Sequence, residues 1–252
     1  MTQLDEWFTA NLLTLNTDKS YFSIFRTTQN QITNLPEVIN FNDKTIMRTK
    51  SIKYLGITLD EFLNWNDHVT STIKSLNSLF SVFYNIRRYL TIEHVRVIYY
   101  TMIYSRIKYG ICAYGFAKKE NIDKVQILQN KLLKVILEKD RRTPTNELHN
   151  TLNILKVKDI FLQEISTFVC NYFQGNLPEG FANYFITMNH GQDTRGNLKS
   201  LVPPQCRTNL GQKTVKYLGS STWNDLTPEL KDISNPKAFR KAYKNKTLKY
   251  SE

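Results

Sequence analysis

The sequence predicts an α+β fold that is mainly α-helical, with a short antiparallel sheet followed by helices. Three observations predict this class. Short aromatic and β-branched runs separated by turn residues occupy the first 62 residues. Apolar residues then recur every three or four positions from Asn66 onward. With 41% hydrophobic and 12% aromatic residues, a chain of 252 residues can bury a core.

The first part of the chain combines a helix with short strands. We expect a helix over 3–13, an aromatic strand over 21–25, a hairpin from 38–41 and 45–47, and an apolar strand over 54–59. An acidic turn follows at Asp60 and Glu61, and a capped helix begins within 64–67. A sheet of only a few short strands is weak and has exposed edges. We therefore predict that residues 19–58 are the least stable part of the chain.

The rest of the chain is predicted to be helical. A helix of about 20–24 residues starts near Asn66, Thr91 caps a second helix, and Gly110 and Gly115 end that one. Later helices are expected over 121–137, 145–152, 157–173 and 236–248, with a small apolar element over 216–226. Residues 174–213 are rich in Gly, Pro, Asn and Gln and are predicted to be an irregular connector.

The net charge of +12 is distributed unevenly along the chain. Residues 1–64 carry −1, residues 65–110 and 111–159 carry +4 each, residues 160–230 are neutral, and residues 231–252 carry +5. Such basic zones indicate a polyanionic partner, with nucleic acid first and an acidic membrane second. A solvated basic surface that maintains solubility is the alternative.

Several classes of protein find no support in the sequence. No apolar run approaches the 18–20 residues that a membrane span needs, and the N-terminus is acidic where a signal peptide would be basic. The three cysteines form no CxxC pair, which predicts a reducing compartment, and we expect an intracellular location in the cytoplasm or nucleus without membrane contact. No nucleotide-binding loop, nucleophile elbow or HExxH helix is present.

Asp60 and Glu61 are the acids most readily imagined as metal ligands. However, a two-metal site needs carboxylates that converge from separate elements, and neighbours on a turn usually face water. We predict no metal site in this chain. The four histidines are scattered, and structural or surface roles are expected for them.

One stretch resembles a known family. KYLGITLD (53–60) and LNWNDH (63–68), followed by a helix, are similar to the segment after the catalytic core of non-LTR (LINE-type, jockey-like) retrotransposon reverse transcriptases. The resemblance continues in the same order on both sides. It includes the stretches WFTANLLTLNTDKS, YSRIKYGICAYG, VQILQNKLLKVIL, RTPTNELHNTLNIL, TRGN, VPPQCRTNLGQKTVKYLGSSTWNDLTPELK and AFRKAYK.

The resemblance implies part of an RNA-directed DNA polymerase with a right-hand fold. Residues 1–62 would be the C-terminal part of the palm, 63–140 a thumb-like helical bundle, and 141–252 a helical C-terminal extension. The family's metal-binding aspartates include an aromatic-x-Asp-Asp turn, and this sequence contains no adjacent Asp pair. The full-length family enzyme uses Mg²⁺, but without these aspartates we expect no cofactor in this chain. For the same reason the chain alone is expected not to polymerise DNA, so its classification as an enzyme stays open.

The resemblance also implies that an RNA–DNA or DNA duplex (template–primer) is the partner, and it implies which residues bind that duplex. It does not indicate an oligomeric state, which stays unknown. Lys19 matches a lysine near the incoming phosphates, or is a surface lysine. The primer-grip region corresponds to Lys53, Tyr54 and Gly56, although the glycine also suits a strand bulge. Trp65 and His68 would either contact the duplex or fasten the thumb helix to the palm. Expected phosphate contacts in the thumb are Lys74, Arg87, Arg88, Arg96, Arg106, Lys108, Lys124, Lys131 and Lys134.

Trp223 and the basic C-terminal helix form either a second contact site or a packed core with a solvated tail. Three functions follow. The first is a reverse transcriptase fragment, which we expect because such elements are often copied incompletely. The second is a non-catalytic nucleic-acid-binding module, and the third is a helical interaction protein.

Overall fold

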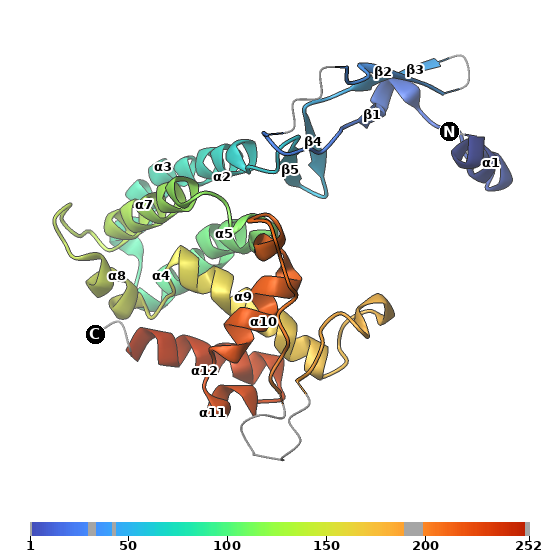
Figure 1. The fold of residues 1–252 in the computed structure, drawn as a ribbon. Helices are drawn as coiled ribbons and strands as arrows, with labels where there is room; N and C mark the ends of the chain where they lie inside the picture. The colour runs from blue at the N-terminus through green and yellow to red at the C-terminus, as the bar shows by residue number, and fades with distance from the viewer. Residues whose placement is uncertain (1, 30–33, 42–43, 189–198, 250–252) are drawn as a thin grey trace. The chain divides into compact units, whose positions relative to one another are not determined.

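The computed structural model describes residues 2–29, 34–41, 44–188 and 199–249 (Figure 1). The chain divides into two compact units, Met1–Thr70 and Ser71–Glu252, and the boundary falls within helix α2, Asn66–Asn77. The fold class is α+β and mainly α, as predicted. The three-part division at residues 62 and 140 stays a prediction. In the described part of the chain, no helix is both long enough and apolar enough to cross a membrane.

In its described residues, the first unit contains helix α1, a 3-10 turn, two small sheets and the first turn of α2. Its elements are α1 (Thr2–Ala10), η1 (Thr17–Lys19), β1 (Tyr21–Phe22), β2 (Val38–Phe41), β3 (Lys44–Arg48), β4 (Ser51–Tyr54) and β5 (Ile57–Asp60). β3 is the central strand of the first sheet, antiparallel to β2 and parallel to β1. The predicted hairpin is thus present as β2–β3, while its turn residues 42–43 lie outside the described residues.

The predicted single strand over 54–59 is wrong, because the chain reverses direction in its middle. β4 and β5 form an antiparallel hairpin in which Tyr54 pairs with Ile57. The two residues between them, Leu55 and Gly56, have φ values of 46° and 80°. Positive φ at both positions is the signature of the two-residue type I′ turn, which follows the natural twist of the flanking strands. Gly56 is therefore a turn residue and not a bulge.

The second unit is helical. Its remaining elements are α3 (Leu79–Ile86), η2 (Arg87–Tyr89), α4 (Ile92–Ile98), η3 (Tyr99–Tyr104), α5 (Ser105–Lys108), α6 (Ile111–Tyr114), α7 (Lys119–Ile136), α8 (Thr145–Leu152), α9 (Val157–Phe173), η4 (Glu179–Phe181), η5 (Gly211–Lys213), α10 (Val215–Asn224), α11 (Pro228–Lys231) and α12 (Pro236–Lys249). The helices expected at 121–137, 145–152, 157–173 and 236–248 are confirmed as α7, α8, α9 and α12.

The first long helix is interrupted, contrary to prediction. α2 ends at Asn77 and α3 begins at Leu79, with Ser78 between them. The Ser78 hydroxyl donates to the Ser75 carbonyl at 2.8 Å. Serine side chains compete for backbone groups in this way, so they weaken a helix at the position where they do so.

The second helix contains a π-helical segment, η3. Thr91 caps its start by accepting a hydrogen bond from the His94 N–H, as predicted. Its buried side chains then recur at strict four-residue intervals: Val95, Tyr99, Ile103 and Ile107. Four residues overshoot one α-helical turn by about 40°, so a straight α-helix would carry this stripe steadily away from the core. The wider turn of the π segment offsets part of that drift.

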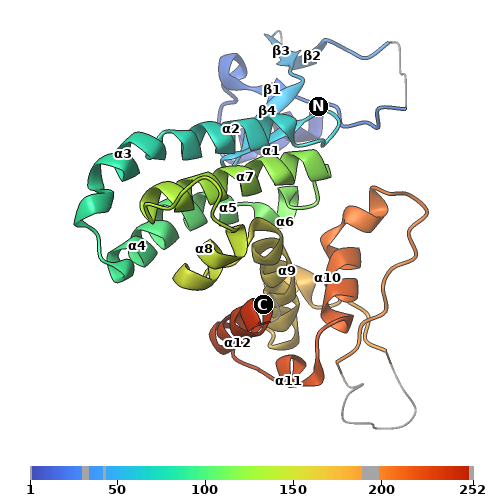
Figure 2. The same cartoon turned by 90° about the vertical axis from the view of Figure 1, so that its left-hand side faces the viewer.

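The core of the second unit is built around α9, which packs against α7, α10 and α12 (Figures 1 and 2). Trp223 of α10 is 1% exposed, and its ring stacks on Phe239 of α12 with centroids 5.7 Å apart. The Trp223 indole N–H donates to the Lys199 carbonyl at 2.8 Å. Trp223 is therefore a packing residue, which leaves only the lysines of α12 for the suggested second contact site.

The predicted connector at 174–213 is largely irregular in its described parts. It contains the short turns η4 and η5 and an isolated antiparallel bridge between Thr187 and Leu201. Residues 189–198 lie outside the described part of the chain.

Candidate nucleic-acid interface

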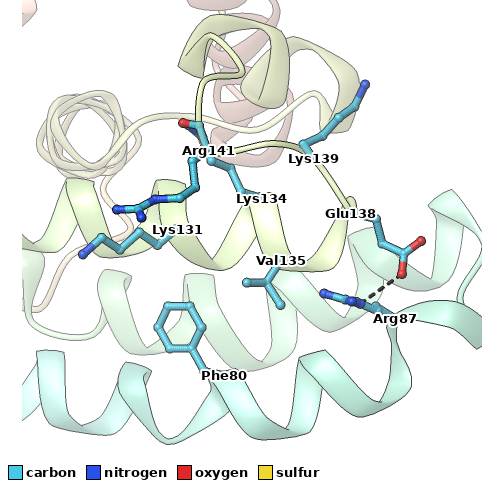
Figure 3. A pocket seen from close by; sticks show the side chains of 8 residues that line it. All are labelled: Phe80, Arg87, Lys131, Lys134, Val135, Glu138, Lys139 and Arg141. Carbon is cyan, nitrogen blue, oxygen red and sulfur yellow. Dashed lines mark hydrogen bonds and ion pairs between the residues drawn. The ribbon is translucent and has the colours of Figure 1, made fainter.

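A basic groove runs along the surface of the second unit between α3, η2, α7 and the loop that follows α7 (Figure 3). Its volume is about 490 Å³. Three of the predicted phosphate contacts, Arg87, Lys131 and Lys134, line this one groove. The full lining consists of Phe80, Arg87, Lys131, Lys134, Val135, Glu138, Lys139 and Arg141.

The periodicity of α7 explains why its lysines face the groove. One side of this helix is buried through Val125, Leu128 and Leu132. Lys131, Lys134 and Val135 are spaced three and four residues apart, so they share a neighbouring stripe that the core does not cover. Lys131 is exposed, whereas Lys134 and Val135 are half-buried. The helix therefore presents two ammonium groups beside an apolar side chain.

The cations of the groove differ in how far they are neutralised. The Arg87 guanidinium pairs with Glu138 at 2.9 Å and lies over the Tyr84 ring, 4.1 Å from its centroid. Lys139 pairs with Glu147 at 3.1 Å, and its side chain points away from the floor of the groove (Figure 3). Lys134 donates to the backbone carbonyl of Arg141, a contact that does not neutralise its charge.

Lys131 and Arg141 have no acidic partner among the described residues, and both extend to the same side of Phe80 (Figure 3). The groove thus holds five cationic side chains against one carboxylate. An excess of this kind attracts anions, and phosphate groups are the natural ligands of clustered Lys and Arg.

Other predicted contacts of the second unit lie outside the groove. Lys74 on α2 and Arg88 in η2 are exposed. The Arg96 guanidinium instead donates to the carbonyls of Leu152 and Thr151, at 3.1 and 3.5 Å. These carbonyls belong to the last turn of α8, where a cation satisfies orphan acceptors and suits the helix dipole. Arg96 therefore has a structural role that charge counting could not anticipate.

The remaining predicted cations either contact other groups of the protein or lie outside the groove. Arg106 donates to the Ser75 carbonyl at 3.1 Å, and Lys108 pairs with Glu164 at 3.1 Å. Lys124 is exposed on α7 but does not line the groove.

The predicted positions of the first unit are exposed. Lys53, Tyr54 and Gly56 lie at the tip of the β4–β5 hairpin, where Tyr54 is 63% exposed. Lys19 ends the 3-10 turn η1 and is also exposed. The hairpin thus presents a lysine, an aromatic ring and a bare backbone segment together.

Asp60 and Glu61 are buried, and the expectation that they face water is wrong. Asp60 accepts hydrogen bonds from the backbone N–H groups of Phe62 and Asn64, each at 3.1 Å, and of Trp65 at 2.9 Å. Its carboxylate therefore satisfies donors in the turn that leads into α2. Sequence reasoning missed this role because the three N–H groups come within hydrogen-bond distance of Asp60 only through the backbone conformation of the turn.

Glu61 is balanced by arginines from distant positions. Its carboxylate pairs with Arg48 at 2.9 Å and with Arg26 at 3.4 Å. The Arg48 side chain is itself only 5% exposed, so this is a buried ion pair. With Asp60 bound by backbone donors and Glu61 by arginines, neither carboxylate suits Mg²⁺. In the part of the chain that the structure describes, no three His, Cys, Asp or Glu side chains gather as metal ligands.

Trp65 and His68 are both buried, at 5% and 6% exposure. The Thr58 N–H of β5 donates to His68 Nδ1 at 3.4 Å, which ties the first turn of α2 to the hairpin. Burial also lowers the pKa of His68, because the charged imidazolium loses hydration. These contacts favour the fastening role over contact with a duplex.

Sequence reasoning missed four lining residues of the groove: Phe80, Val135, Lys139 and Arg141. The basic excess of residues 111–159 was the available signal for Lys139 and Arg141. Phe80 and Val135 carry no charge, so the charge pattern could not identify them.

Curated proteins from transposable elements match this chain. It is 25% identical over 162 residues to a probable RNA-directed DNA polymerase from transposon BS of Drosophila melanogaster, covering 63% of this chain and 18% of the relative. It is 29% identical over 124 residues to the RNA-directed DNA polymerase from mobile element jockey of the same fly, covering 48% of this chain and 14% of the relative.

The protein of the same description from Drosophila funebris is 27% identical over 128 residues, again covering 48% of this chain and 14% of the relative. No family model matches the chain, and no solved structure matches it significantly. The chain spans less than a fifth of the length of the curated relatives it matches. The order of its motifs and these alignments agree, and the chain is similar to part of the RNA-directed DNA polymerases of jockey-like non-LTR retrotransposons.

Proposed function

We propose that this chain is the template–primer-binding portion of such a reverse transcriptase and binds an RNA–DNA or DNA duplex without catalysing polymerisation itself. The observation that carries the proposal is the groove in which Arg87, Lys131 and Lys134 come together with Lys139 and Arg141. Phosphate contacts of this kind position a nucleic acid but do not read its sequence. A polymerase that copies any template needs such contacts.

The β4–β5 hairpin supplies the second part of the proposal. Its exposed tip offers Lys53 for a phosphate, Tyr54 for stacking, and Gly56 for close approach of backbone to a strand. We assign it to the primer side by resemblance to the family's primer grip. The Mg²⁺ of the family enzyme has no suitable ligands in Asp60 and Glu61, so polymerisation is not assigned to this chain.

The test is duplex binding by a variant that removes two charges from the groove. Lys131→Ala/Lys134→Ala is compared with Lys118→Ala/Lys119→Ala, which removes the same charge near the start of the same helix, about 18–24 Å away along its axis. Binding of a labelled RNA–DNA duplex is followed by fluorescence anisotropy between 50 and 200 mM salt. Each lost phosphate contact should weaken binding about 8-fold near 0.1 M salt and flatten the salt dependence by about 0.9 in log–log slope.

We therefore expect roughly 60-fold weaker binding and a slope reduced by about 2 for the groove variant, with little change for the control. Equal loss in both variants would mean that only net charge matters and would reject the groove as the binding site. Absence of salt-dependent binding by the unaltered chain would reject the proposal altogether and favour a helical interaction protein.

A further inference from the structure

The groove has an apolar floor in addition to the cationic side chains that would bind the phosphates of a duplex. Its floor is apolar, formed by Phe80 of α3 and Val135 of α7, while its rim is cationic (Figure 3). A phosphate needs only the rim. Recesses of a few hundred Å³ with an apolar lining and a few placed polar groups are typical of sites that enclose a small organic ligand.

The two sides of the groove offer different chemistry. Lys131 and Arg141 extend on one side of Phe80 without acidic partners among the described residues. On the other side lie Arg87 and Glu138, whose ion pair combines hydrogen-bond donors with a carboxylate acceptor that is 50% exposed. An occupant that matches both sides is anionic at one end and carries a flat apolar body with polar edges at the other.

We propose that this groove binds one unpaired nucleotide of a nucleic-acid strand, with its base against Phe80 and Val135 and its adjoining phosphates on Lys131 and Arg141. A base has an apolar face and a polar edge, and its phosphates supply the anionic end. Aromatic side chains stack on any base, so the site needs no sequence preference. The inference rests on the proposed function, and it adds that the strand entering this groove is single at that point.

Two ligands that differ only in the base test the assignment on the unaltered chain. The first is a labelled single-stranded oligothymidylate of twelve nucleotides, and the second is the same strand with its central bases replaced by abasic sites. Backbone charge is identical, so a site that binds only phosphates treats them equally. We expect the abasic strand to bind about 10-fold more weakly, since stacking is lost. Equal affinities would overturn the proposal.

A second arm alters the floor and leaves the charges unchanged. Val135→Phe fills the recess, and Val97→Phe is the matched control, because Val97 on α4 is 61% exposed and does not line the groove. We expect Val135→Phe to weaken single-strand binding about 10-fold and to change blunt-duplex binding less than about 2-fold. Unchanged single-strand affinity in a folded Val135→Phe variant would refute the assignment.

The outcomes separate this inference from the proposed function. If blunt duplex binds through Lys131 and Lys134 while the base makes no difference, the duplex function stands and the nucleotide site falls. A free mononucleotide at 1 mM is expected not to displace the oligonucleotide, since it lacks the second phosphate contact. Displacement would overturn the assignment to a strand in favour of a small-molecule site.

Discussion

Asp60 offers a sharp test of how the β4–β5 hairpin is joined to α2. The change Asp60→Asn keeps the size of the side chain but replaces one carboxylate oxygen with an amide that can only donate. Because Oδ1 accepts two backbone N–H groups and Oδ2 accepts the Trp65 N–H, no orientation of the amide satisfies all three donors.

The cost follows from these contacts. At least one N–H is left facing another donor in a buried position, which costs about 1–3 kcal/mol. The remaining bonds lose their charged acceptor, and hydrogen bonds to charged groups contribute about 1 kcal/mol more than neutral ones. We expect a total loss of about 3 kcal/mol, equivalent to roughly 150-fold more frequent opening of this region.

Hydrogen exchange measured by mass spectrometry on peptides over residues 57–70 reports that opening directly. Asp67→Asn is the matched control, because Asp67 is an exposed acid in the first turn of the same helix. Peptides from α9 provide an internal reference. If Asp60→Asn and Asp67→Asn exchange at the same rate, the argument that Asp60 joins the two elements is refuted.

Two further changes probe the second unit. Burial lowers the pKa of His149 to about 4, so between pH 6.5 and 4 the unfolded chain binds more protons than the folded one. The free energy of unfolding should therefore fall by up to about 3 kcal/mol on acidification. Chemical denaturation followed by far-ultraviolet circular dichroism at each pH checks this, and a His149→Gln variant should show a flatter profile. Gly115→Ala should destabilise the second unit by about 1–3 kcal/mol, because the added Cβ would lie 2.2 Å from Phe161 Cδ2. Gly180→Ala is the control: a Cβ at that position would have no atom within 4 Å, so this variant should be neutral in the same denaturation assay.

Helices were predictable where local periodicity and packing agree. α7 and α9 carry apolar residues at helical spacing over 17 or 18 positions, so their ranges could be stated to within a few residues. The break at Ser78 and the turn at Leu55 and Gly56 were not predictable in the same way. A type I′ turn usually announces itself with Asn-Gly or Asp-Gly, and a leucine at its first central position carries no such signal.

The candidate site was predictable in part. Clustered charge identified Arg87, Lys131 and Lys134, but the same reasoning also selected Arg96, which is engaged by the end of α8. The difference lies in tertiary contacts between residues more than 50 positions apart. The arginine partners of Glu61 lie 13 and 35 positions away from it in the sequence, so charge counting predicted an exposed acid where the fold places a buried ion pair.

The π-helical segment at Tyr99–Tyr104 has a consequence for how this fold tolerates changes in chain length. A π turn accommodates one more residue than the α-helical turn it replaces. Deleting one residue within 99–104 would therefore return the turn to α-helical geometry and leave the helix beyond it facing the same way. The same deletion elsewhere in the helix would rotate everything after it by about 100°. Single-residue length differences among relatives should accordingly gather in this turn.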